Sequence, residues 1–197
     1  MSSKLKVLQV IPKLGYGGAE TGCYDLAHYL AEKDCKSYIM TSGGELLKYV
    51  KKDKVKITTT MGSFTVQLYD DVPYHKANFI YLARQKYFDS TQFHRVVKDF
   101  IIQGGNSDDR RTADKRGDIG RYLLPPDANK GHKHHRGTIS MPSSERDNPH
   151  KLASPYEFFI VVTKPGSYHL DGSYTPFGRV VEGMDVVDAI NNVPVGD

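Results

Sequence analysis

Polar and apolar residues alternate along the stretch VKITTTMGSFTVQLY, which begins directly after Lys54. In an extended chain, alternate side chains share one face, so this pattern predicts two strands that each bury one side. The apolar positions on that side are Val55, Ile57, Phe64, Val66 and Leu68. The Met61-Gly62 pair between the two runs indicates a tight turn, and together the segments predict an antiparallel hairpin.

The chain after residue 69 continues with further short segments that are typical of strands. Short apolar segments follow at GTISM, FFIVVT and FGRVV, separated by loops rich in Gly, Pro, Asp and Ser. Within residues 54–197, apolar residues at helical spacing occur over residues 75–85 and 184–191. Many short strands with two helices predict a mainly β fold, a closed antiparallel β-barrel capped by two helices.

Residues 1–53 follow a different pattern. A continuous apolar run at 7–11 precedes a Gly-rich turn, and helical spacing and a second apolar run at 38–40 come after it. Unalternating strands are typical of parallel sheets covered on both faces, so a small β-α-β segment is predicted, with a short helix over residues 45–52. The chain is therefore divided into a first domain, 1–53, and a second, 54–197.

Composition narrows the class of protein. With 197 residues, of which 39% are hydrophobic and 25% charged, the chain has enough apolar residues for a core of ordinary size. The net charge is only +4, and the basic residues are interspersed with acidic ones. The chain therefore lacks the dense basic stripe of a nucleic-acid-binding surface, and a nucleic-acid partner is not expected. No apolar run approaches the length of a membrane span, and Cys23 and Cys35 offer no disulfide framework. A soluble, cytoplasmic protein that does not bind membranes is the expectation.

Four ordered motifs make the pattern specific: FHRVVKDFIIQGG, GTISM, YEFFIVVT and LDGSYTPFGRVVEGMDVVDAI. Together they resemble the cyclophilin-type peptidyl-prolyl cis/trans isomerases over residues 54–197. The resemblance implies an eight-stranded antiparallel barrel with two helices, an active groove on its outer surface, no cofactor and no metal. Its partners would be Pro-containing peptides and unfolded proteins.

Arg95 is the candidate catalytic residue. Rotation about an X-Pro bond is slow because amide resonance gives the C–N bond double-bond character. A fixed cation that donates to the prolyl nitrogen interacts more strongly with the twisted amide than with either planar form. His94 is expected to be structural, because isomerisation needs no net proton transfer.

The resemblance also assigns the substrate-binding residues. Gln103 would hold the peptide backbone, and the residues expected around the proline are Phe100, Ile101, Met141, Phe159 and Leu170. Of the neighbouring Phe158 and Phe159, only one can point to the core, and the resemblance places Phe159 in the groove. Pro142 is also assigned to the groove, and the Met141-Pro142 pair, together with SPYEFF, resembles a bacterial-type subgroup of the family.

Three groove positions depart from the family pattern. Glu157 replaces a common Gln, His169 replaces a Trp, and Tyr174 stands where a His is familiar. Loss of the indole removes area and an N–H donor, so only weak binding of cyclosporin-type cyclic peptides is expected. Glu157 is either a solvated carboxylate at the rim or a group that favours basic peptides.

Other segments leave alternatives open. The cluster of His132, His134 and His135 suggests a metal, but no carboxylate or Cys lies at ligand spacing. PKLGYGGAE with its flanks resembles the start of a family 4-like glycosyltransferase of the GT-B fold, which makes glycosyl transfer a remote alternative. The first alternative to an isomerase is a cyclophilin-like module that binds Pro-containing peptides without catalysis.

The final strand that closes the cyclophilin barrel is not found before Asp197, which predicts an unpaired edge. One hypothesis is that residues 7–11 or 38–40 pair with this edge near residues 55–59, within one chain or across a dimer formed through the N-terminal segment. The alternative is that the N-terminal segment packs elsewhere or pairs with its own copy in a second subunit.

Overall fold

The computed structural model describes residues 6–11, 18–33, 36–41, 53–128, 130–143 and 148–194. These residues fall into two compact units that divide after residue 52. The first unit holds β1 (Lys6–Val10), α1 (Gly18–Glu32) and β2 (Lys36–Met40), with β1 and β2 paired in parallel. The helix expected over 45–52 and Cys35 lie outside the described residues.

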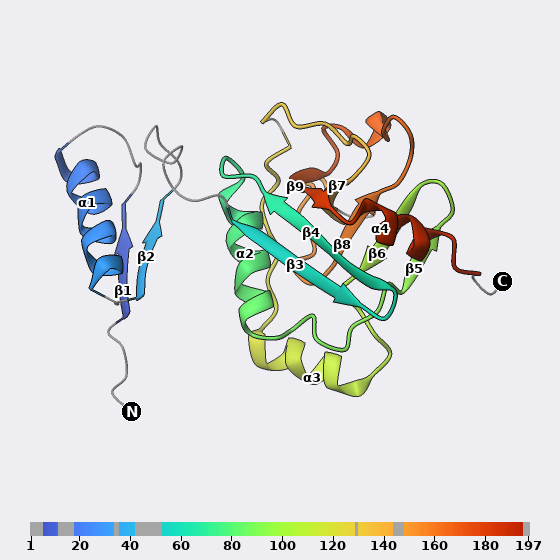
Figure 1. Ribbon diagram of the computed structural model, residues 1–197, viewed down its shortest axis with the longest axis horizontal. Coiled ribbons are helices and arrows are strands. Elements are labelled where there is room, and N and C mark those ends of the chain that lie inside the picture. The colour runs from blue at the N-terminus through green and yellow to red at the C-terminus, as the bar shows by residue number, and fades with distance from the viewer. Residues whose placement is uncertain are drawn as a thin grey trace. The chain divides into compact units, whose positions relative to one another are not determined.

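The second unit is built on one antiparallel sheet of seven strands (Figure 1). Its strands in chain order are β3 (Lys54–Thr59), β4 (Gly62–Leu68), β5 (Arg95–Val97), β6 (Ile101–Gly104), β7 (Thr138–Met141), β8 (Phe158–Val161) and β9 (Thr175–Glu182). Their order across the sheet is β3-β4-β9-β7-β8-β6-β5. The described strands therefore form a half-barrel with β3 and β5 at its edges, in place of the expected closed barrel.

The predicted hairpin is formed by β3 and β4. Thr59 pairs with Gly62 across the turn, and Phe64, Val66 and Leu68 are all buried, as the alternation of polar and apolar residues predicts. β3 is one of the two edge strands, and β1 and β2 pair with each other. Pairing of an N-terminal strand with β3 stays a prediction.

Two helices cover the inner face of the sheet. Phe79 of α2 (Pro73–Arg84) contacts Phe158 and Phe177, with ring centroids 5.5 and 5.3 Å away. Val187 and Ile190 of α4 (Met184–Asn191) join the same core cluster. Burial of these side chains removes apolar area from water and supplies the main stabilising term of this unit.

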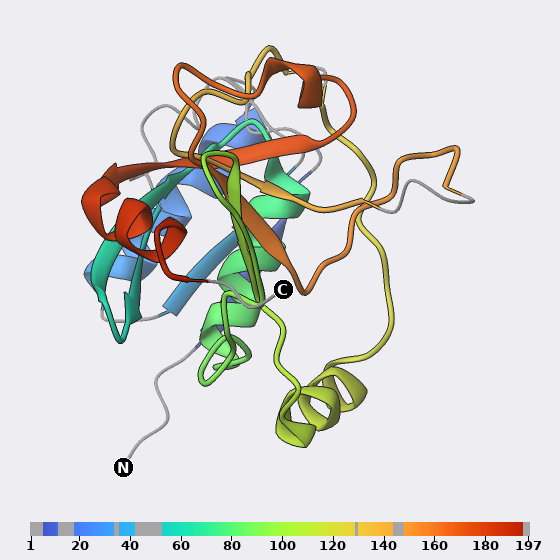
Figure 2. The same ribbon diagram turned by 90° about the vertical axis from the view of Figure 1, so that its right-hand side faces the viewer.

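A third helix was not predicted from the sequence. α3 (Arg110–Ile119) lies away from the sheet, at the end of extended segments (Figure 2). Its N-cap is Asp109, whose side chain accepts a hydrogen bond from the Arg111 backbone N–H at 2.9 Å. Thr112 is its one buried residue, so the helix has almost no apolar stripe that would reveal it in the sequence.

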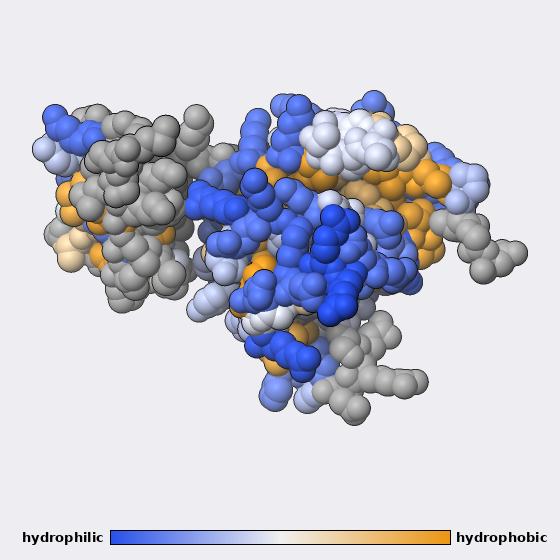
Figure 3. Space-filling view, turned by 90° about the horizontal axis from the view of Figure 1, so that it is seen from below, coloured by the Kyte–Doolittle hydropathy of each residue, from blue (hydrophilic) through white to orange (hydrophobic). Residues whose placement is uncertain are grey.

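The surface of the second unit is mostly hydrophilic, with apolar residues gathered toward one side of the face seen in Figure 3. Large hydrophobic residues that remain exposed in this unit are Met61, Tyr74, Tyr81, Leu123, Tyr168 and Val193. No helix among the described residues is long and apolar enough to cross a membrane.

Candidate active site

The outer face of the sheet carries a row of four paired residues. Arg95 on β5 pairs with Gln103 on β6, Gln103 pairs with Phe159 on β8, and Phe159 pairs with Ser140 on β7. Directly paired residues in antiparallel strands point to the same face. The strand register thus places a guanidinium, an amide and a phenyl ring side by side, although 64 positions separate the first from the third.

An apolar cluster lies on this same face. Ile101, Phe159 and Val161 form its buried part, and the partly buried residues packed against it are Val97, Phe100, Leu170 and Tyr174. Tyr174 meets Phe159 edge to face, with centroids 5.6 Å apart at 89°. Phe158 and Ile160 belong to the inner core, so the alternation along β8 separates Phe158 from Phe159 in the way the sequence predicts.

Met141 differs from its predicted position. The residue is 1% exposed and belongs to the inner core cluster with Ile139, and not to the outer apolar cluster. Alternation along β7 explains this, because Ser140 takes the outer face and Met141 the inner one. Pro142, which follows, is half-buried, and its carbonyl accepts a hydrogen bond from the Ser154 N–H at 2.9 Å.

The polar side of the row is held by hydrogen bonds. The Arg95 guanidinium donates to the Gln103 Oε1 atom at 3.3 Å, and the Gln103 Nε2 atom donates to a Glu157 oxygen at 2.8 Å. The amide orientation follows from these two partners. His94 lies 3.5 Å from the same carboxylate, and Arg116 lies 3.7 Å from its other oxygen. Glu157 therefore receives three polar side chains, an arrangement that differs from a freely solvated rim carboxylate.

His169 lies against Phe100, one of the partly buried residues of the apolar cluster. Its ring stacks on Phe100, with centroids 5.5 Å apart and planes 23° apart. It comes from a short 3-10 helix (Tyr168–Leu170), which also supplies Leu170. The structure thus gathers Arg95, Gln103 and Glu157 beside an apolar surface that has His169 and Tyr174 at its margin.

The three histidines of the predicted cluster do not converge. His132 contacts Asp71 at 2.8 Å, His134 contacts Asp171 at 2.8 Å, and His135 contacts the Tyr168 hydroxyl at 3.0 Å. Within the described ranges, no group of three His, Cys, Asp or Glu side chains is arranged to hold a metal ion.

Asn191, a positioning residue, was missed by the sequence analysis. This buried residue at the end of α4 donates through Nδ2 to the Val97 carbonyl at 2.9 Å and accepts the Asp99 N–H at 2.9 Å. Val97 ends β5 and Asp99 lies in the turn that leads to β6, so Asn191 holds the hairpin that presents Arg95. A polar residue in the last turn of an amphipathic helix gives no sequence signal of this role.

Comparisons with known proteins identify the family of the second unit. The model of the cyclophilin type peptidyl-prolyl cis-trans isomerase family matches residues 54–197. The chain belongs to this family. A peptidyl-prolyl cis-trans isomerase-like 1 protein of Neurospora crassa is 40% identical over 144 residues, which cover 71% of this chain and 82% of that protein.

Two further cyclophilin relatives extend the comparison. A peptidyl-prolyl cis-trans isomerase-like 2 protein of Rhizopus delemar is 32% identical over 204 residues; the match covers 95% of this chain but only 37% of that relative. The crystal structure of a cyclophilin type isomerase from Cryptosporidium parvum, in the presence of the dipeptide Ala-Pro, is 28% identical with a TM-score of 0.60. That match covers 73% of this chain and 88% of the other. The comparisons do not support the resemblance of residues 1–53 to a glycosyltransferase.

Proposed function

We propose that the outer face of this cyclophilin catalyses cis/trans rotation about X-Pro bonds, with Arg95 as the catalytic residue. The observation that carries the proposal is the row Arg95-Gln103-Phe159, which sets a guanidinium and an amide directly beside an apolar surface. A proline ring needs the apolar surface, and the peptide group next to it needs the polar one.

The proposed chemistry is electrostatic. Rotation requires the prolyl nitrogen to leave conjugation, and its lone pair then becomes a better hydrogen-bond acceptor. The Arg95 guanidinium, permanently charged, donates to that nitrogen in the twisted state. A charge-assisted hydrogen bond contributes about 1.5–3 kcal/mol, which corresponds to roughly ten- to a hundredfold in rate.

The neighbours of Arg95 supply the remaining conditions. Phe100, Phe159 and Leu170 exclude water from the proline ring, and low local polarity strengthens the hydrogen bond from the guanidinium. Gln103, held by Glu157 on one side, presents its amide at a fixed angle to the peptide backbone. Pre-positioned groups need no reorganisation when the amide twists.

Pro-containing peptides and unfolded chains are the proposed substrates. The relative from Cryptosporidium parvum was crystallised in the presence of Ala-Pro, a minimal X-Pro unit. Slow X-Pro isomerisation limits the folding of many proteins, so assistance of folding is the expected role. A cytoplasmic location is part of the proposal and rests on the low cysteine content. Weak binding of cyclosporin-type peptides, and a dimer through residues 1–53, are proposed on the sequence arguments alone.

A non-catalytic binder of Pro-peptides is the second candidate, because the same apolar surface would bind proline without accelerating its rotation. The two functions are separated by NMR exchange spectroscopy on an Ala-Pro peptide with and without the protein. Faster exchange between the cis and trans signals supports the isomerase. Peptide shifts that titrate with protein while the exchange rate stays constant support the binder and contradict the proposed function.

A further inference from the structure

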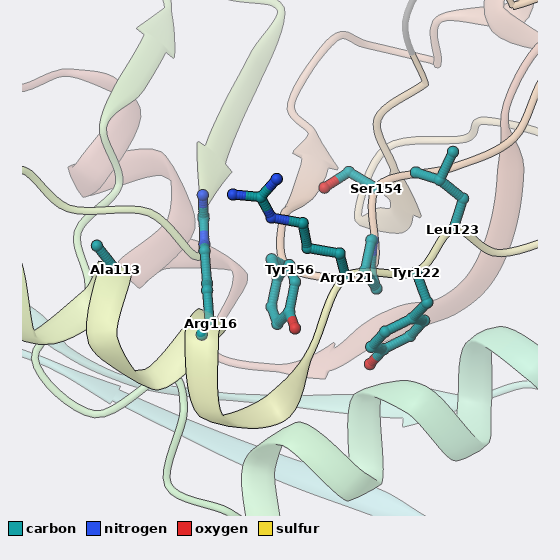
Figure 4. A pocket seen from close by; sticks show the side chains of 9 residues that line it. Ala113, Arg116, Arg121, Tyr122, Leu123, Ser154 and Tyr156 are labelled. Atoms are coloured by element: carbon teal, nitrogen blue, oxygen red, sulfur yellow. The ribbon is translucent and has the colours of Figure 1, made fainter.

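A hollow lies beside the groove, between α3 and the segment that leads into β8 (Figure 4). Its volume is about 760 Å³, within the range of ligand-binding clefts. The residues that line it are Ala113, Arg116, Gly117, Arg121, Tyr122, Leu123, Ser154, Pro155 and Tyr156. Neither the cyclophilin resemblance nor the proposed catalytic step uses this surface.

The two tyrosines of the hollow present apolar ring surfaces to it, because their hydroxyls are already hydrogen-bonded elsewhere. The Tyr122 hydroxyl donates to Asn78 Oδ1 at 2.6 Å, and the Tyr156 hydroxyl donates to the Gly120 carbonyl. Their rings face the hollow, and Figure 4 shows Tyr156 beside the Arg121 side chain. Such walls suit the methylene groups of a bound side chain.

The charge of the hollow is positive. Arg116 and Arg121 direct their guanidinium groups to the same end of it (Figure 4). Arg116 is partly neutralised, because Glu157 lies 3.7 Å away, and it also donates to the Tyr87 hydroxyl at 2.8 Å. In the described part of the chain, no hydrogen bond or ion pair engages the Arg121 side chain, so one cation at the rim is left without a counter-charge.

The hollow is connected to the catalytic row by three contacts. Arg116 approaches one Glu157 oxygen, Gln103 donates to the other at 2.8 Å, and Arg95 donates to Gln103 at 3.3 Å. Tyr156 also immediately precedes Glu157 in the chain. A peptide whose proline lies against Phe159 therefore has neighbouring residues within reach of the hollow.

We propose that this hollow binds an acidic side chain of the substrate peptide, within three residues of the proline. The inference rests on the proposed function and adds a substrate class to it. Arg121 holds the carboxylate, and the Ser154 hydroxyl is available as a further donor. Arg116, whose guanidinium is engaged by Tyr87, Gly105 and Glu157, adds positive charge at the same end, and the tyrosine rings cover the methylene groups. This reverses the preference for basic peptides that Glu157 alone suggests, because Glu157 is occupied by Gln103 and Arg116.

The test uses a set of seven-residue peptides, each with one Ala-Pro unit and a single Glu placed at one of the positions from three before to three after the proline. A matched set carries Gln in place of Glu. For each peptide, kcat/KM is measured by NMR exchange and Kd by titration, with the full chain at low salt. We expect a preference for Glu of about 3- to 10-fold at one position, reduced at high salt.

Two variants locate the preference. Arg121→Gln should lower the Glu-to-Gln ratio at that position to about 1, because the unpaired cation is removed. Arg110→Gln removes the same charge from α3 outside the hollow and should leave the ratio unchanged. The proposed acidic site is overturned if the wild-type Glu-to-Gln ratio is near 1 at every position. It is also overturned if Arg121→Gln and Arg110→Gln lower that ratio equally. Absence of any catalysis contradicts the isomerase function separately, and the Kd ratios then still decide whether the hollow selects acids.

Discussion

The Nδ1 atom of His134 lies 2.8 Å from Oδ1 of Asp171, behind the apolar cluster of the groove. The His134 ring stacks on Phe159, with centroids 6.1 Å apart and planes 12° apart, and its Nε2 atom lies 3.2 Å from the Ser140 hydroxyl. Burial lowers the pKa of His134 despite the hydrogen bond with Asp171, so the neutral ring donates from Nδ1 to the carboxylate. Ser140 is fully buried, so a substrate cannot reach its hydroxyl and the three residues do not form a hydrolytic triad. Their role is structural: Asp171 and Ser140 fix the His134 ring, and the ring supports Phe159.

The first prediction concerns this support. Asp171→Ala removes the acceptor of both the His134 ring and the His134 backbone N–H, leaving buried donors unpaired. We expect the free energy of unfolding to fall by about 1–3 kcal/mol, and kcat/KM to fall because Phe159 and the adjacent Leu170 lose their fixed positions. Urea unfolding and the exchange assay measure the two effects. Asp89→Ala, at an exposed turn, is the control, and equal stability of both variants would refute the supporting role.

The second prediction concerns catalysis at Arg95. Arg95→Ala should lower kcat/KM by roughly ten- to a hundredfold, because a charge-assisted hydrogen bond to the twisted amide is lost. Arg95→Lys should recover part of this loss, since it retains the charge but not the planar fork. Lys98→Ala removes an exposed cation from the same hairpin and should leave the rate unchanged. Full activity of Arg95→Ala in the NMR exchange assay would exclude Arg95 as the catalytic residue.

The third prediction concerns His169, which stacks on Phe100 at the margin of the apolar cluster. His169→Trp should bind cyclosporin-type peptides more tightly than the wild type, because the indole adds buried area and an N–H donor. Calorimetric titration compares the two proteins. Tyr168→Trp adds an indole one residue away, where Tyr168 contacts His135, and should change the affinity little. Equal gains in both variants would place the drug-binding surface elsewhere.

Features that depend on the alternation of neighbouring residues could be predicted from the sequence. Alternation alone separates Phe158 from Phe159 and buries one face of β4. The predicted position of Met141 was wrong because it came from the family resemblance. Alternation along β7 places Met141 on the inner face, the same face as Ile139. α3 escaped prediction because its residues are nearly all polar, although Asp109 is a suitable N-cap. The contacts of His134, Arg116 and Asn191 join segments distant in sequence, and no local signal encodes such pairings.

The fourth prediction concerns pH and His75. This α2 residue is fully buried, neither ring nitrogen has a hydrogen-bond partner, and burial lowers its pKa from 6.5 to about 4. The unfolded chain therefore binds a proton between pH 6.5 and about 4 that the folded state does not. Stability is lost as the pH falls through this window, by about 3 kcal/mol from this group, and no further loss follows below pH 4.

His75→Leu tests this account because leucine has a similar volume and no proton to bind. Its free energy of unfolding should decline less than that of the wild type between pH 6.5 and 4, and should be equal or higher at pH 7, since two unpaired polar atoms are removed. Denaturant unfolding at half-unit pH steps gives both curves. His150→Leu, at an exposed position, should follow the wild type. Parallel curves for His75→Leu and the wild type would contradict the buried neutral histidine.

The fifth prediction concerns Gly105, which follows Gln103 and Gly104 at the end of β6. Its φ of +94° disfavours any L side chain, and a Cβ atom there would lie 2.3 Å from the Tyr156 carbonyl oxygen. Gly105→Ala must displace Tyr156 and its neighbour Glu157, which orients Gln103. We expect a loss of about 2 kcal/mol or more in the free energy of unfolding, together with lower kcat/KM.

Gly117→Ala is the matched substitution for Gly105→Ala. Gly117 lies inside α3 with a φ that is not in the left-handed region and with no heavy atom within 4 Å of the added Cβ. Alanine there lowers the conformational freedom of the unfolded chain and should raise stability by about 0.5–1 kcal/mol. The two Gly→Ala changes should thus shift the unfolding midpoint in opposite directions. If Gly105→Ala unfolds at the wild-type midpoint and retains full activity, the close approach of the β6 end to Tyr156 does not position Glu157 or Gln103.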